Sequence, residues 1–141
     1  MAKVGGQAGY GKGHFVENIS AAKTLTTGDS GKLFTITQSS AFKISLPKAA
    51  DAGVGWNAKF IITTAGSYAV TIEPDSSEDT LIGMVVSAAG SESADQSSES
   101  GVDVLSFING AAAGDWVELM CDGSNFYVSG MIHDSAHVTI V

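Results

Sequence analysis

The chain has 141 residues, a length typical of one domain, and its single cysteine, Cys121, excludes a framework of intrachain disulfides. Hydrophobic residues make up 44% and charged residues 16% of the chain, with 17 glycines and 2 prolines. This composition is typical of an ordered, turn-rich β protein and excludes an intrinsically disordered chain. No apolar leader opens the chain, and no stretch approaches the ~20 apolar residues of a membrane span. We therefore expect a soluble protein that is made in the cytoplasm and has no membrane partner.

Charge is divided unevenly along the chain. All seven basic residues are lysines within residues 1–59, which carry a net charge of +4, whereas residues 60–141 carry −12, giving −8 in total. This asymmetry indicates either a basic docking segment on an acidic body or simply a soluble surface. The chain has no arginine, the residue that most often reads bases, so we expect no nucleic-acid partner.

Residues 1–22 have the composition of an arm. Glycines recur between Gly5 and Gly13, and the isolated side chains of Val4, Tyr10 and Phe15 follow neither a strand nor a helix period. Such a segment cannot bury itself alone. It predicts an extended N-terminal arm that becomes ordered on a partner, and a merely frayed terminus is the alternative.

From Lys23 onward the pattern predicts short strands and turns. Alternating runs predict strands over 33–37, 42–46, 56–64 and 68–73, with Pro47 ending the second. Short turns, such as Gly66-Ser67, predict that successive strands are antiparallel neighbours. The segment 48–53 is interpreted as one helical turn or a loop.

The second half continues this pattern around one low-complexity segment. A strand is predicted over 80–87 with a bulge at Gly83, then an acidic, Ser-rich loop over 88–101 and a central strand over 102–108. Asp122-Gly123 between alternating runs at 116–121 and 126–131 is a strong hairpin signal, and 138–141 forms a last strand. The predicted fold is therefore a single all-β domain over 23–141, an antiparallel β-sandwich or jelly-roll-like barrel.

Few residues point to chemistry. His133 and His137 have a spacing that holds a metal on a helix, but the surrounding sequence predicts a loop. An acidic stretch at 75–79 offers oxygen ligands for calcium without a calcium-loop motif, so a solvated turn is preferred. Cys121 has only acids near it and is interpreted as a small buried side chain.

No Gly-x-Ser-x-Gly or P-loop motif is present in the sequence. A pair of catalytic carboxylates could still meet in space. We expect no enzymatic activity, no cofactor and no metal.

Three segments together resemble a β-module of tailed-phage virion proteins. They are Thr24–Lys32, Ser45–Pro47 and the hairpin turn Asp122–Phe126, in which Phe126 stands where tryptophan is common. The module occurs in capsid decoration (cement) proteins and in some tail and fibre proteins. Residues 1–22 and 88–101 have no counterpart in it.

The resemblance implies a structural virion protein. Its most specific implication is a decoration protein that binds the outer capsid surface as a homotrimer, contacts the major capsid protein and stabilises the shell. We expect its capsid-binding residues in the arm, at Lys3, Tyr10, Lys12 and Phe15.

Two alternatives remain at this stage. The first is a tail or fibre component of a phage virion built on the same module. The second is a carbohydrate-binding jelly roll that uses Trp56, Trp116 or Tyr127 as a stacking platform.

Overall fold

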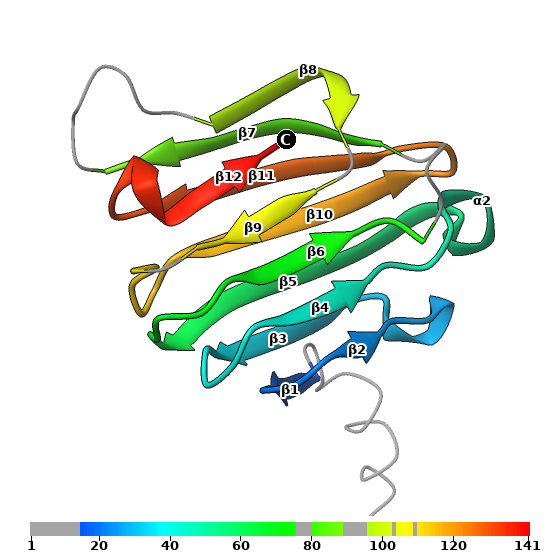
Figure 1. Ribbon diagram of the computed structural model, residues 1–141. Helices are drawn as coiled ribbons and strands as arrows, with labels where there is room; N and C mark the ends of the chain where they lie inside the picture. The colour runs from blue at the N-terminus through cyan, green and yellow to red at the C-terminus, as the bar shows by residue number, and fades with distance from the viewer. Residues whose placement is uncertain (1–14, 76–79, 89–95, 103, 109) are drawn as a thin grey trace, which may run out of the picture.

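Two β-sheets packed face to face make up most of the structure (Figure 1). The computed structural model describes residues 15–75, 80–88, 96–102, 104–108 and 110–141. Within these ranges one sheet has seven strands: β1 (Val16–Ile19), β3 (Lys32–Thr37), β5 (Val54–Thr64), β10 (Trp116–Asp122), β11 (Phe126–Ile132), β7 (Leu81–Ser87) and β8 (Gln96–Val102), in that order. The other has five: β12 (Val138–Ile140), β9 (Leu105–Phe107), β6 (Val70–Glu73), β4 (Phe42–Ser45) and β2 (Lys23–Thr24). The helical segments in these ranges are short: η1 (Thr27–Asp29), α2 (Ala49–Ala52) and η2 (Ser135–His137).

The predicted sandwich-like, mostly β architecture is confirmed, but its purely antiparallel pairing is wrong. From β1 to β7 every connection passes from one sheet to the other, so strands of one sheet are joined through a strand of the facing sheet. As a result β1, β3 and β5 run parallel, as do β2, β4 and β6 (Figure 1). Antiparallel pairing occurs where β10 joins β5 and β11, where β8 joins β7, and where β9 joins β6 and β12. Both sheets are therefore mixed.

The turn at Gly66-Ser67 illustrates this correction. Instead of closing a hairpin, it carries the chain from β5 in one sheet to β6 in the other. The Gly66 amide donates a hydrogen bond of 3.1 Å to the side-chain oxygen of Gln38, which is itself buried. A Cβ at residue 66 would lie 1.9 Å from the Gln38 carbonyl oxygen, so only glycine fits this crossing.

Alternate residues of both sheets meet in one apolar core. Phe34 and Phe60 stack with ring centroids 5.3 Å apart, and Trp56 meets Phe126 edge to face at 5.7 Å. These rings are all buried, and burial of such a side chain stabilises the fold by roughly 2–3 kcal/mol. The predicted inward faces of β3, β5 and β10 are confirmed, as is the hairpin of β10 and β11.

Ion pairs link the two sheets at the edge of the sandwich where β1 and β2 lie. Lys32 donates to Glu17 at 3.0 Å and to Asp29 at 2.6 Å, while Lys23 of the facing sheet also donates to Glu17. Lys23 first, and Lys32 second, lower the pKa of the Glu17 carboxyl. Residues 16–19 of the predicted arm are thus a strand tied to both sheets. Residues 1–14 lie outside the described part.

The predicted loop at 88–101 is wrong for its second half, because Gln96–Val102 forms β8 and pairs antiparallel with β7. An edge strand needs only backbone hydrogen bonds to its neighbour, so a polar sequence can form one. Residues 89–95 lie outside the described ranges. The predicted irregularity at Gly83 is confirmed, since the β7–β8 register shifts between Leu81 and Gly83.

Replacing Gly83 by alanine tests the close approach of β7 to β11. Gly83 has φ of 146°, and a Cβ there would lie 2.0 Å from the Val128 carbonyl oxygen. We expect Gly83→Ala to lower the free energy of unfolding by about 2 kcal/mol or more. Gly28→Ala is the control, because its Cβ would meet no atom closer than 3.7 Å. Equal urea midpoints for the two variants would contradict the assigned role of Gly83.

Candidate functional site

The outer face of the seven-stranded sheet carries large apolar side chains around a polar centre of Lys59, Glu118 and Ser129, and it is the candidate interaction surface. Side chains alternate along each strand, so in β10 Val117, Leu119 and Cys121 enter the core while Trp116 and Met120 face outward. The same alternation in β7 and β11 exposes further large apolar side chains. Those more than one third exposed in β7, β10 and β11 are Met84, Val86, Met120, Tyr127 and Met131, and Val16 of β1 is exposed on the same face.

Strand register gathers these side chains into continuous rows. Met131 of β11 lies between Trp116 of β10 and Val86 of β7. Tyr127 likewise lies between Met120 and Ile82 of the same two neighbouring strands. The partly buried Leu33 and Ile61 extend the apolar surface across β3 and β5. We call this surface, formed by the outward residues of β3, β5, β10, β11 and β7, the apolar face.

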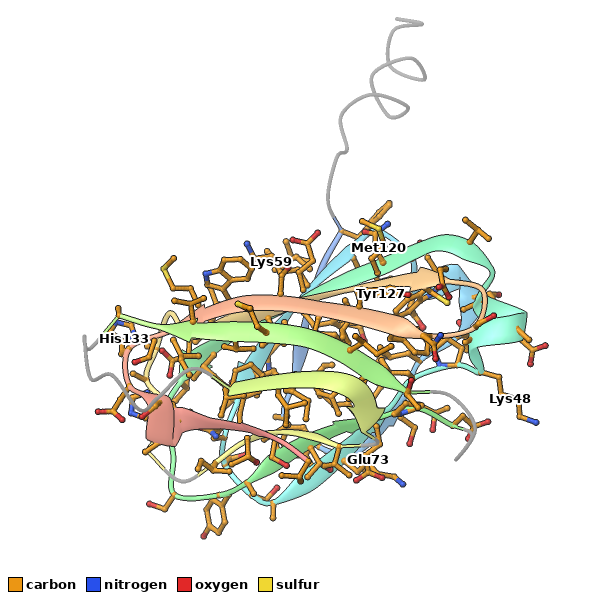
Figure 2. The ribbon with its side chains drawn as sticks, turned by 90° about the horizontal axis from the view of Figure 1, so that it is seen from above. Lys48, Lys59, Glu73, Met120, Tyr127 and His133 are labelled. Atoms are coloured by element: carbon orange, nitrogen blue, oxygen red, sulfur yellow. The ribbon has the colours of Figure 1, made fainter. Side chains whose placement is uncertain are left out.

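The opposite side of the sandwich is polar. In β4 and β6 the inward residues are apolar, but the outward ones are Lys43, Ser45, Thr71 and Glu73. Lys43 and Glu73 form an ion pair of 3.1 Å across the two strands. Figure 2 shows Lys59, Met120 and Tyr127 projecting from one side of the sandwich and Glu73 from the other. Only one of the two outer faces therefore has the polarity expected of a water-facing sheet.

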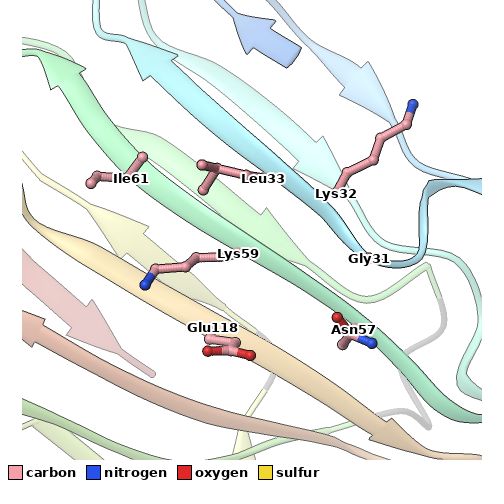
Figure 3. A pocket seen from close by; sticks show the side chains of 7 residues that line it. All are labelled: Gly31, Lys32, Leu33, Asn57, Lys59, Ile61 and Glu118. Carbon is pink, nitrogen blue, oxygen red and sulfur yellow. The ribbon is translucent and has the colours of Figure 1, made fainter. Parts of the chain in front are cut away.

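A shallow groove of about 400 Å³ crosses the apolar face and contains its central charges. Lys59 of β5 and Glu118 of β10 are register partners, and they lie side by side at this groove (Figure 3). The ammonium of Lys59 lies 4.0 Å from the centroid of the Trp116 ring, which it covers in a cation–π contact. The groove is lined by Gly31, Lys32, Leu33, Asn57, Lys59, Ile61 and Glu118.

A second polar arrangement lies at the end of the sheet, around the buried carboxylate of Asp115. The Nδ1 atom of His133 lies 2.6 Å from one oxygen of Asp115, and Nδ1 of His137 lies 2.7 Å from the other. The backbone amides of Ala112 and His133 each donate to the same carboxylate at 2.8 Å. Burial opposes the charge of Asp115, but the hydrogen bonds led by His133 outweigh it and lower the pKa of this carboxyl.

This cluster has a structural role that the sequence spacing did not reveal. The sequence predicted a loop here and no contact between the two histidines, but His133 and His137 both contact Asp115. Asp115 thereby joins the turn before β10 to the end of β11 and to η2. In the described ranges no group of three or more His, Cys, Asp or Glu side chains is arranged to hold a metal ion.

Most of the other residues predicted as functional are not among those that the structure describes. Lys3, Tyr10 and Lys12, like most of the acidic stretch 75–79, lie outside the described residues. Phe15 is 73% exposed at the start of β1, where its carbonyl accepts a hydrogen bond from Leu33.

The proposed carbohydrate-stacking residues are also dispersed. Trp56 is buried in the core, where its indole nitrogen donates to the Thr26 carbonyl, so it cannot form part of a surface platform. Trp116 lies under Lys59, and Tyr127 is exposed but directs its hydroxyl to Asp122 at 3.1 Å. Cys121 is buried as predicted.

The apolar face was not predicted from the sequence, although a signal was present. The segment 81–86 is apolar at both alternating positions, and Met120, Tyr127 and Met131 all occupy the outward positions of their hairpin. Counting outward apolar residues strand by strand would have found it.

No protein-family model, curated protein or solved structure matches the chain. None of the helical segments in the described ranges has the length and hydrophobicity that crossing a membrane requires.

Replacing Asp115 by asparagine tests the structural role of the cluster. Both carboxylate oxygens of Asp115 accept hydrogen bonds, so the NH₂ group of an asparagine would have to face a hydrogen-bond donor. We therefore expect Asp115→Asn to lower the free energy of unfolding by roughly 2–3 kcal/mol at neutral pH. Because the pKa of Asp115 is lowered from 3.8, its contribution is present above that pH and is lost as the pH falls through the lower, folded-state value.

Urea unfolding of both proteins across this pH range measures the effect. The stability difference between wild type and Asp115→Asn should shrink below pH 3.8. Asp134→Asn is a control in an exposed neighbour that caps η2. A difference between wild type and Asp115→Asn that does not change with pH would contradict the assigned role.

Proposed function

We propose that this protein is a non-catalytic structural component of a phage virion, a capsid decoration protein that binds the outer capsid surface as a homotrimer and stabilises the shell. The observation that carries the proposal is the apolar face. Leaving large apolar side chains in water costs about 25 cal/mol per Å² of exposed apolar area, and covering them with protein recovers this free energy. A contiguous surface of this kind is typical of a protein that functions while bound to other proteins.

The segments that resemble phage virion proteins support the proposal through the fold. Asp29 accepts a hydrogen bond from the Thr26 amide at 2.7 Å, and Gly31 has a φ of 82°. Asp122 accepts from the amides of Ser124 and Asn125 at 2.8 and 2.7 Å. These residues form turns and caps rather than a binding site. The resemblance therefore bears on the module itself, and the partner has to be inferred from the surfaces.

We assign capsid binding to the first fifteen residues of the chain. Phe15 and Val16 are 73% and 62% exposed where the chain enters the seven-stranded sheet, so uncovered apolar side chains lie where the first fourteen residues join it. An extended segment anchored by Tyr10 and Phe15 can add a strand to a sheet edge of the major capsid protein. Lys3 and Lys12 supply the charge to meet an acidic capsid surface. Three arms on one trimer would multiply weak contacts through avidity.

Cosedimentation with capsids that lack the protein tests this assignment. We expect deletion of residues 2–14 to abolish binding, and Phe15→Ser to weaken it about tenfold or more, as for a central aromatic anchor. Both changes leave β1 intact, because Glu17 and its partners are retained. Tyr68→Ser is the matched control, an exposed aromatic in the connection between β5 and β6.

Full capsid binding by the truncated chain would overturn the role of the arm. If the intact protein fails to bind capsids but is found in purified tails, the tail or fibre alternative replaces the decoration role.

A further inference from the structure

We propose that the apolar face is the surface through which copies of this chain pack on one another. This inference rests on the proposed function, from which it takes the number of copies in the homotrimer. It adds the contact that would hold those copies together. The predicted arm is left free to reach the capsid.

The face is large enough for a contact between copies, although smaller than a standard interface. Its five strands, spaced ~4.8 Å apart, span roughly 20 Å, and the seven-residue strands at its centre run for roughly 23 Å. The resulting area of about 450 Å² is a little more than half of the ~800 Å² that each partner contributes to a standard protein interface.

The side chains of the face suit a protein partner that is itself a sheet. Methionine and aromatic residues are enriched in the centres of interfaces, and Met84, Met120 and Met131 are each more than half exposed here. Unbranched thioether side chains can interdigitate with a copy of themselves without demanding one rotamer.

Charge favours a second copy over an unrelated protein. The whole chain carries −8, so copies repel one another over most of their surfaces. At the centre of the face, Lys59 and Glu118 lie side by side with opposite charges. Copies arranged about a three-fold axis with this face inward bring Glu118 of one copy toward Lys59 of the next, so that the pair is self-complementary around the ring. The polar face, with Lys43 already paired to Glu73, offers no comparable apolar contact.

The solution mass of the full-length chain, measured by light scattering and sedimentation velocity, tests the proposal. We expect a mass of more than one chain for the wild type and of one chain for Met131→Glu. Met131 is 52% exposed, so the added charge leaves the monomer folded. Thr71→Glu makes the same charge change on the polar face beside Lys43 and should keep the wild-type mass. Unfolding curves confirm that each variant is folded.

A charge-exchange experiment identifies the contact between chains. Lys59→Glu and Glu118→Lys, each alone, should weaken assembly about tenfold or more, because like charges then meet at its centre. The double variant, Lys59→Glu with Glu118→Lys, restores opposite charges at every contact and should restore the assembled mass.

Two results would overturn the inference: a monomeric wild type, or an assembly that Met131→Glu leaves intact. Capsid cosedimentation separates these failures from failure of the proposed function. A monomer that still binds capsids refutes self-packing alone. A wild-type dimer that Met131→Glu dissociates supports the apolar face and contradicts the homotrimer.

Discussion

The structure depends on one constraint, which is that both sheets bury their inward residues in a single shared core. The chain meets this constraint by crossing from sheet to sheet at each step from β1 to β7. Each crossing places the next strand in the opposite sheet. The stacked rings of Phe34 and Phe60 are buried between the two sheets. Parallel pairing of β1, β3 and β5 follows directly, because strands joined through the facing sheet return in the same direction. The ion pairs of Glu17 then join β1 to β2 and β3, and the carboxylate of Asp115 joins the turn before β10 to η2.

Burial of the inward residues leaves two outer faces that need not be alike. The five-stranded sheet turns Lys43, Thr71 and Glu73 outward, as a sheet in contact with water does. The seven-stranded sheet turns methionines and aromatic residues outward instead. The fold does not require this difference, since charged or polar residues at these positions would serve the core equally well. The difference between the two outer faces is therefore the feature of the molecule on which the proposed function rests.

Much of the local structure could be predicted from the pattern of residues. The runs at 33–37, 42–46 and 56–64 and the Asp122-Gly123 hairpin were predicted because alternation and turn residues act over a few neighbours. The topology could not be predicted in the same way. An alternating pattern shows which face of a strand is buried. It does not show whether the strand pairs with the preceding strand in the same sheet or lies in the facing sheet, because the same face is buried in both cases. The strand β8 was missed for a related reason, because its backbone pairing leaves no apolar pattern in the sequence.

By itself the sequence determined the class of the fold, the inward faces of its central strands and the residues that make its turns, since these depend on local periodicity and backbone preference. Only the tertiary structure decided which strands become neighbours, that His133 and His137 meet on Asp115, and that Met120, Tyr127 and Met131 merge with residues of β7 into one face. The physical reason is that a contact between residues far apart in the chain depends on the register and order of strands. Register and order are set by how the whole core packs, and no short stretch of sequence encodes them.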